Sequence, residues 1–362
     1  MASIAANRMP WWAWAWPTLA WALLTAASVL GPSNGIVVAC IGFALIATVF
    51  AAVYHAEVIA HRVGEPFGTL VLAIAVTVIE VALIVSIMLQ GGADKAALAR
   101  DTVFAAVMIV CNGITGLCLL AGGMRHHEQG FQLQGALAAL AVLAALMVLS
   151  LVVPNVTLST PGPSFNTAQL IFASVVSLVL YGSFVFIQTI RHRDYFLPDD
   201  GDHEAHAPPP ARNVALASLG LLIASLVAVV GLAKTLSPTL EILVAQLGAP
   251  KAVVGIMIAA LVLLPEGLAA FNAARLNRLQ TSMNLALGSA LASIGLTVPA
   301  VAVVSILLRQ PLTLGLEPKE VVLLALTLLV SVVTLGTGRT TVLQGIVHLV
   351  IFAAFLFLAI VP

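Results

Sequence analysis

Two glutamates lie inside long apolar stretches of the sequence, where a charged side chain is costly. Glu80 belongs to the stretch 73–88, and Glu266 belongs to the stretch 253–271. A charge at the centre of a membrane-spanning helix costs roughly 2.5–3.5 kcal/mol on insertion scales, so such a residue faces a protein interior or a wet cavity. A buried carboxyl group keeps its proton until a nearby cation compensates for the lost hydration. The two glutamates therefore predict a site where a proton and a cation compete.

Neutral oxygen atoms lie near both glutamates. Thr77 is three residues before Glu80 and shares its helical face. Carboxylate and neutral oxygens suit hard cations such as Na⁺, K⁺ and Ca²⁺. We therefore predict a cation and proton site with the two glutamates as the metal ligands and no cofactor. Its residues are Glu80, Glu266, Asn112, Thr77, Ser289 and Ser293.

These residues also have structural interpretations. An intramembrane Ser or Thr often bonds to the backbone of its own helix, and a neutral glutamic acid can form a helix-packing hydrogen bond. Asn112 needs several partners, because a buried amide carries two donors and an acceptor. Pro265, directly before Glu266, removes a backbone hydrogen bond and leaves a carbonyl free to line a cavity.

The sequence upstream of each glutamate is repeated. Residues 57–66 and 241–250 share a glutamate, an aliphatic pair, a glycine and a proline in the same register. The repeated glutamates, Glu57 and Glu241, are expected near helix ends as interfacial or capping residues; the alternative is a role in gating or proton entry. A duplicated membrane protein with one buried acid in each copy is typical of an ion-coupled transporter.

Composition places the chain in a lipid bilayer. Of 362 residues, 61% are hydrophobic and 8% are charged, with a mean hydropathy of +1.11. Fifteen basic and fifteen acidic residues leave no net charge to attract nucleic acid. Five tryptophans between Trp11 and Trp21 predict a retained first span rather than a cleaved signal peptide. Three cysteines, Cys40, Cys111 and Cys118, are expected to be buried thiols.

Apolar runs of about 20 residues predict an all-α integral membrane protein of eleven transmembrane helices. An N-terminal helix (1–34) precedes a first five-helix repeat (35–190), and a second, inverted repeat (213–362) follows a linker (191–212). The expected spans are Trp12 to Leu30, Gly35 to Val58, Phe67 to Gln90, Thr102 to Gly122, Leu133 to Val153, Ala168 to Ile190, Asn213 to Leu232, Val253 to Asn272, Met283 to Leu308, Val321 to Leu335 and Thr341 to Ile360.

The linker 191–212 is acidic and contains histidines and a Pro-Pro-Pro run. We interpret it as a solvated loop between the repeats, with a cation or pH sensor as the alternative. Arginine and lysine are more frequent on the side shared by the N-terminus and this linker, nine residues against six. The bias predicts a cytoplasmic N-terminus and, with eleven spans, a periplasmic C-terminus.

Two stretches resemble a known family. Gly64-Glu65-Pro66-Phe67-Gly68-Thr69 leads to Val76-Thr77-Val78-Ile79-Glu80, and Leu264-Pro265-Glu266-Gly267 is followed by Leu287-Gly288-Ser289-Ala290-Leu291-Ala292-Ser293. The pair resembles the calcium/cation antiporter superfamily and, within it, the bacterial ChaA branch of sodium-potassium/proton and calcium/proton antiporters. The resemblance implies ten core helices in two inverted repeats, an extra N-terminal helix, a cation bound between the two acids, and a bacterial inner membrane.

The sequence departs from the family at informative positions. Proton/calcium exchangers usually read Gly-Asn-Ala-x-Glu around each acid, whereas Thr77 and Leu263 replace the asparagines here, and Ala292 stands where a glutamine is frequent. Fewer neutral oxygens favour Na⁺ or K⁺ first and Ca²⁺ second. A Ca²⁺-selective exchanger and a cation channel remain the alternatives. An enzyme is not expected, because no His-Glu-x-x-His motif is present.

Overall fold

The computed structural model describes residues 9–30, 35–64, 67–91, 95–197, 209–246, 248, 250 and 252–361. The chain forms two compact units. The first unit comprises residues 1–90 and 203–251, and the second comprises residues 91–202 and 252–362. Each unit therefore combines segments from both halves of the sequence.

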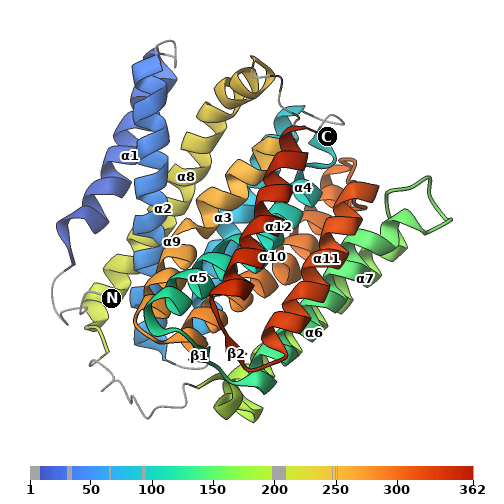
Figure 1. Cartoon of the computed structure of the whole chain (residues 1–362). Coiled ribbons are helices and arrows are strands. Elements are labelled where there is room, and N and C mark those ends of the chain that lie inside the picture. Colours follow the sequence, from blue (N-terminus) through green and yellow to red (C-terminus); the bar gives the residue numbers. More distant parts are fainter. Residues whose placement is uncertain are drawn as a thin grey trace. The chain divides into compact units, whose positions relative to one another are not determined.

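The first unit consists of helices. They are α1 (Trp11–Leu30), α2 (Gly35–Val63), α3 (Phe67–Gly91) and α8 (Arg212–Gln246). Helices α1, α2 and α8 pack against one another (Figure 1). Trp12 of α1 meets Tyr54 of α2 edge to face at 5.1 Å, and the indole nitrogen of Trp21 donates to the carbonyl of Ala224 at 3.1 Å. Tryptophans of α1 thus attach the first helix to its neighbours.

Helix α8 is longer than the sequence predicts. The expected span ends at Leu232, but the helix continues to Gln246 and includes Lys234 and Pro238. Lys234 is exposed, while Leu236 and Ser237 are buried, so the packed face continues past the charge. A proline inside a helix removes a single backbone hydrogen bond, and the remaining bonds and the packed face sustain the helix.

Two glycines of the repeated motif share an unusual backbone conformation. Gly64 follows α2 and has a φ of 77°, and Gly248 follows α8 and has a φ of 66°. Glycine adopts this left-handed region without the steric cost that a Cβ atom brings. The repeated glycine therefore ends the corresponding helix in both halves of the chain.

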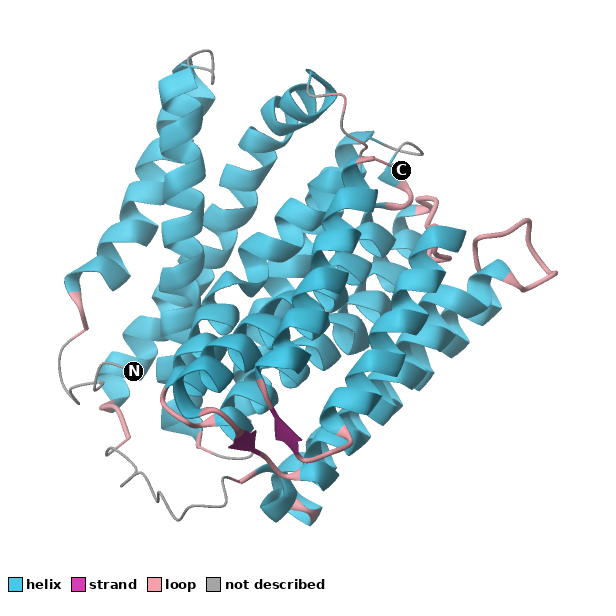
Figure 2. Ribbon diagram, viewed as in Figure 1, coloured by secondary structure: helices cyan, strands magenta, loops and turns pink. Residues whose placement is uncertain are grey.

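The second unit contains the remaining helices and a short strand pair. Its helices are α4 (Leu98–Met108), η2 (Ile109–Ile114), α5 (Thr115–His126), α6 (Leu133–Met147), η3 (Val148–Val152), η4 (Val153–Asn155), α7 (Thr167–Phe186), η5 (Ile187–Arg191), η6 (Arg193–Phe196), α9 (Ala252–Arg275), α10 (Leu279–Leu308), α11 (Pro318–Leu335) and α12 (Val342–Ile360). Strand β1 (Gln129–Gly130) pairs antiparallel with β2 (Arg339–Thr340), as Figure 2 shows.

Local sequence signals set where three of these helices begin. Asn166 and Gln169 form a reciprocal capping box at the start of α7, and Thr341 and Gln344 form one at the start of α12. A third box, between Glu317 and Glu320, starts α11. Each box satisfies backbone N–H groups that the first helical turn leaves without partners.

The expected membrane architecture is confirmed. Nine helices in the described part of the chain are long and apolar enough to cross a membrane, and the predicted segments of α1 and α3 are also helical there. The continuous span Leu98–His126, formed by α4, η2 and α5, is the most enclosed, with 89% of its apolar window buried. The segment that carries Asn112 therefore lies at the centre of the second unit.

One cysteine is not where the sequence analysis expected it. Cys111 and Cys118 are buried, whereas Cys40 is exposed on α2. The thiol is a small, weakly polar group, so an outward-facing position on a membrane-spanning helix needs no hydrogen-bond partner.

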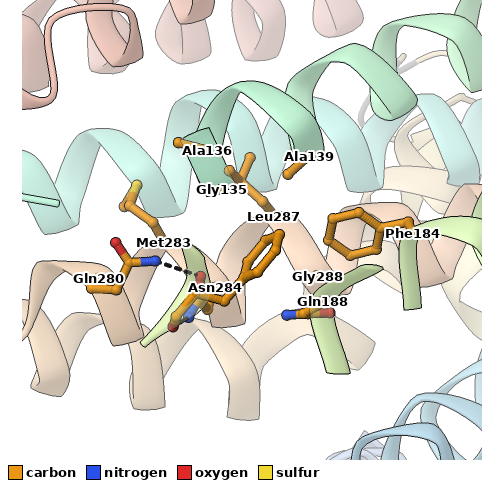
Figure 3. Close-up of a pocket in the computed structure, with 11 residues that line it drawn as sticks. Gly135, Ala136, Ala139, Phe184, Gln188, Gln280, Met283, Asn284, Leu287 and Gly288 are labelled. Carbon is orange, nitrogen blue, oxygen red and sulfur yellow. Dashed lines mark hydrogen bonds between the residues drawn. The ribbon is translucent and has the colours of Figure 1, made fainter. Parts of the chain in front are cut away.

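The start of the expected linker is folded. Phe196 has a buried ring, and its backbone carbonyl accepts a 2.6 Å hydrogen bond from Asn284 of α10. Asn284 also accepts from Gln280, beside a pocket between α6, α7 and α10 (Figure 3). Residues 192–197 thus pack as part of the second unit, and His203, His206 and most acids of the linker lie outside the described residues.

Candidate functional site

Four of the six predicted site residues lie on helices of the second unit that pack together. Glu266 is on α9, Asn112 is on η2, and Ser289 and Ser293 are on α10. Helices α9, α10 and η2 contact one another. A Cβ atom at Gly267 would lie 3.0 Å from the side chain of Ile114, so the turn that carries Glu266 rests directly on η2. The structure therefore brings these three segments together.

These four residues differ in burial. Asn112 has no exposed surface and Ser293 is buried, whereas Glu266 and Ser289 are half-buried. Pro265 is buried inside α9, where it leaves the carbonyl of residue 261 without its helical N–H donor. Half-buried carboxylate and hydroxyl groups beside fully buried ones can receive an ion from a wet cavity and hold it among protein oxygens.

Glu80 and Thr77 lie in the first unit, both on α3. Glu80 is 3% exposed and Thr77 is 6% exposed. The hydroxyl of Thr77 donates to the carbonyl of Ala73 at 2.8 Å. The Thr77 hydroxyl thus bonds to its own helix, as intramembrane threonines often do. A hydroxyl oxygen nevertheless keeps two lone pairs when its proton is donated. Thr77 can donate to its own helix and still offer an oxygen beside the Glu80 carboxylate.

Asn112 belongs to a buried hydrogen-bonded chain that the sequence analysis missed. Its amide nitrogen Nδ2 donates to Oγ1 of Thr327 on α11 at 2.9 Å, and its Oδ1 lies 3.1 Å from Nδ1 of His348 on α12. Nε2 of His348 lies 3.2 Å from Oγ1 of Thr334, and the Thr327 hydroxyl donates to Sδ of Met108 at 3.5 Å. His348 and Thr327 have no exposed surface.

A lone histidine in an apolar stretch was the one sequence feature that could have indicated these hydrogen bonds. His348 stands among apolar residues of the stretch 342–360, where a polar ring needs partners. The partners lie on other helices. Asn112 is 215 positions from Thr327 and 236 positions from His348. Sequence spacing does not reveal such long-range pairs.

The backbone around Asn112 is a π-helical turn rather than a regular α-helix. The hydroxyl of Thr115 donates to the carbonyl of Val110 at 2.9 Å, which supports the wider turn. Such turns often occur at functional sites. A Cβ atom at Gly116 would lie 2.9 Å from Leu349 and 3.1 Å from the Cβ of His348. The absence of a side chain at Gly116 lets α12 approach closely enough for His348 to reach Asn112.

The repeated glutamates lie near helix ends. Glu57 is half-buried, six residues before α2 ends at Val63. Glu241 is on α8, five residues before that helix ends at Gln246, and its side chain lies outside the described residues.

Relatives of this chain are transporters. y4hA of Sinorhizobium fredii (strain NBRC 101917 / NGR234), whose name marks it as a proposed ionic transporter, is 51% identical over 99% of this chain and 98% of its own length. The sodium-potassium/proton antiporter ChaA of Escherichia coli (strain K12) is 37% identical over 86% of this chain and 85% of its own length.

A solved structure shares the fold. YfkE superposes with a TM-score of 0.75 over 97% of this chain and 100% of its own, at 17% identity. The sodium/calcium exchanger protein family matches residues 34–190 and 217–361, on either side of the linker. The resemblance to the calcium/cation antiporter superfamily is thus confirmed, and the chain belongs to the sodium/calcium exchanger protein family.

Proposed function

We propose that this membrane protein exchanges Na⁺ or K⁺ for protons by competition at Glu80 and Glu266. The observation that carries the proposal is the burial of Glu80, at 3% exposure, beside Thr77 on a spanning helix. Glu266 supports it from the second unit, where its helix packs on the segments of Asn112, Ser289 and Ser293. The name of the Escherichia coli relative includes the same three ions.

Competition follows from the solvation of a carboxylate. Inside the membrane a carboxylate is stable when it carries a proton or contacts a cation, and it is costly when bare. Arrival of a cation therefore displaces the proton, and departure of the cation requires a proton in return. If the site opens to one side at a time, each cation moved is exchanged for protons, and no continuous pore is needed.

The neutral oxygens set the selectivity. The candidate neutral ligands are Thr77 in the first unit and Asn112, Ser289 and Ser293 in the second. Proton/calcium exchangers usually carry amide side chains where Thr77, Leu263 and Ala292 stand here, and fewer amide oxygens favour a monovalent ion over Ca²⁺, which takes six to eight oxygen ligands. The second candidate is a Ca²⁺/proton exchanger, which is favoured by a Bacillus subtilis relative named as a Ca²⁺/H⁺ antiporter, 22% identical over 68% of this chain.

The proposal includes a placement in the cell. We place the chain in a bacterial inner membrane because it resembles the bacterial branch of its family. We orient it with a cytoplasmic N-terminus and a periplasmic C-terminus because arginines and lysines are more frequent on the N-terminal side. Glu57 and Glu241, near the ends of α2 and α8, are proposed to take part in gating or proton entry.

The test is cation-dependent collapse of a preformed pH gradient in everted membrane vesicles. NaCl, KCl or CaCl₂ is added at neutral to alkaline pH to vesicles with wild type, Glu80→Gln or Glu266→Gln. We expect collapse by Na⁺ or K⁺ in the wild type and loss of collapse in both variants at equal protein amounts. An intact gradient in the wild type, or full exchange in both variants, contradicts the proposal. Collapse by Ca²⁺ alone selects the second candidate.

A further inference from the structure

We propose that His348 is a positioning residue that holds the Asn112 amide with its oxygen presented to the transported cation. The inference rests on the proposed function, because it assigns Asn112 to the cation site. It concerns α12, a helix that carries none of the predicted ligands. The observation behind it is the hydrogen-bonded chain from Met108 through Thr327, Asn112 and His348 to Thr334.

The direction of this chain is determined at one end. The thioether sulfur of Met108 can only accept, so the Thr327 hydroxyl donates its proton there. Oγ1 of Thr327 then accepts from Nδ2 of Asn112, at 2.9 Å. The amide oxygen of Asn112 is therefore the atom that faces His348. Because an amide oxygen only accepts, Nδ1 of His348 carries the proton that it donates across 3.1 Å.

The far nitrogen of His348 completes the chain. With the proton on Nδ1, Nε2 of a neutral imidazole is an acceptor, and the Thr334 hydroxyl, 3.2 Å away, can donate to it. Both ring nitrogens thus have a partner of the correct kind, and the backbone carbonyl of Cys111 is a further acceptor for the His348 ring. Reversal of the amide would oppose the bond direction at Met108, so the buried chain selects one orientation of Asn112.

The selected orientation matters for a cation. An amide nitrogen carries two protons and repels a cation, whereas the amide oxygen attracts it. The oxygen of Asn112 has two lone pairs and gives one to His348, which leaves the second for a ligand. Asn112 has no exposed surface, and η2 packs against both α9 and α10, which carry Glu266, Ser289 and Ser293. In the proposed arrangement the second lone pair of this oxygen faces the site, so loss of the donor at position 348 would let the amide turn its nitrogen into it.

Close packing keeps the histidine in place. Gly116 lies against Leu349 and the Cβ of His348. A Cβ atom added at Gly345 would lie 2.5 Å from the backbone nitrogen of Leu120. The two small residues allow α5 and α12 to approach on adjacent turns. His348 is therefore held by its helix as well as by its hydrogen bonds.

The experiment compares His348→Leu, which has no donor, with His348→Gln, whose side-chain amide can still donate. For each, the cation concentration for half-maximal exchange and the maximal rate per transporter are measured in vesicles. We expect His348→Leu to raise the half-maximal concentration about threefold to tenfold, the worth of one interhelical hydrogen bond. We expect His348→Gln to restore most of the wild-type value.

A double substitution separates positioning from general stability. In an Asn112→Ala background, His348→Leu should raise the half-maximal concentration no further, because the residue through which it acts is missing. His55→Leu is the matched control, since His55 is equally buried but bonds to the carbonyl of Ala13 on α1. It should keep the wild-type half-maximal concentration.

Two results would overturn the inference. His348→Leu could leave the half-maximal concentration unchanged, or it could act equally with and without Asn112. Cation-dependent thermal unfolding of the purified protein, in NaCl, KCl or CaCl₂, provides a second readout of the same binding constants. If wild-type vesicles show no exchange, the proposed function fails, and the unfolding measurements still decide whether His348 acts through Asn112.

Discussion

The amide nitrogen of Asn112 donates to Oγ1 of Thr327 at 2.9 Å and so joins η2 to α11. The two residues are 215 positions apart, and neither side chain has exposed surface. Water cannot replace a lost partner at such a position, so the bond should contribute both to stability and to the orientation of the amide.

Thr327→Val tests this bond because it keeps the side-chain shape and removes the hydroxyl. We expect the free energy of unfolding to fall by about 1 kcal/mol, as measured for interhelical hydrogen bonds in membranes. SDS-driven unfolding in mixed micelles measures it. Thr102→Val is the control, since Thr102 is equally buried but bonds to the carbonyl of Leu98 in its own helix. Equal losses in both variants would show that the bond to Asn112 contributes nothing of its own.

Thr77 provides a test of the first unit. Its hydroxyl already donates to Ala73, so Thr77→Val removes the free lone pairs beside Glu80 with little change in packing. We expect the cation concentration for half-maximal exchange to rise by about fivefold to tenfold, and Thr77→Ser to keep the wild-type value. Thr48→Val, which removes a similar bond to Ala44 on α2, should have no effect. The ligand assignment fails if Thr77→Val and Thr48→Val behave alike.

Gly116 predicts a packing effect. An alanine Cβ at this position would lie 2.9 Å from Cγ of Leu349, closer than carbon atoms in contact normally approach. Overpacking of this kind typically costs about 1–3 kcal/mol. Gly182 on α7 has no heavy atom within 4 Å of an added Cβ, so Gly182→Ala should be neutral or slightly stabilising. Thermal unfolding in detergent compares them, and a neutral Gly116→Ala would contradict the close approach of α12.

The membrane helices could be predicted from the sequence because apolar length alone determines them. The eleven expected helices are present, and nearly all of their ends fall within a few residues of the predicted ones. The exception is α8, where Lys234 and Pro238 suggested an end but the packed face continued. Local charge and proline signals are weak where tertiary contacts sustain a helix.

The site was predictable only in part. Acids are conspicuous in an apolar sequence, so Glu80 and Glu266 could be proposed as site residues without a structure. His348 and Thr327 could not be connected to Asn112, because their hydrogen bonds depend on how α11 and α12 pack against η2. For Thr77, the spacing from Glu80 predicted a shared helical face, but it did not predict the hydrogen bond to the carbonyl of Ala73.

The ion pair of Arg100 and Asp101 at the start of α4 should contribute more to the free energy of unfolding than its position near a helix end suggests. Nη2 of Arg100 lies 2.7 Å from Oδ1 of Asp101, and both side chains are about nine-tenths buried. Nη1 of Arg100 also donates to the carbonyl of Gly315 at 3.1 Å, ahead of α11. Removal of the Asp101 carboxylate takes the hydrogen-bonded counter-ion away from a buried guanidinium group.

We expect Asp101→Asn to lower the free energy of unfolding by about 3–5 kcal/mol, the usual cost of breaking a buried pair by removal of one partner. Glu128→Gln is the matched control. Its partner Arg339 lies 3.6 Å away, and both side chains are more than half exposed, so the loss should stay within about 1 kcal/mol and shrink further at high salt. SDS-driven unfolding at two salt concentrations measures both. Equal, salt-sensitive losses would mean that the Arg100–Asp101 pair is solvated like a surface pair.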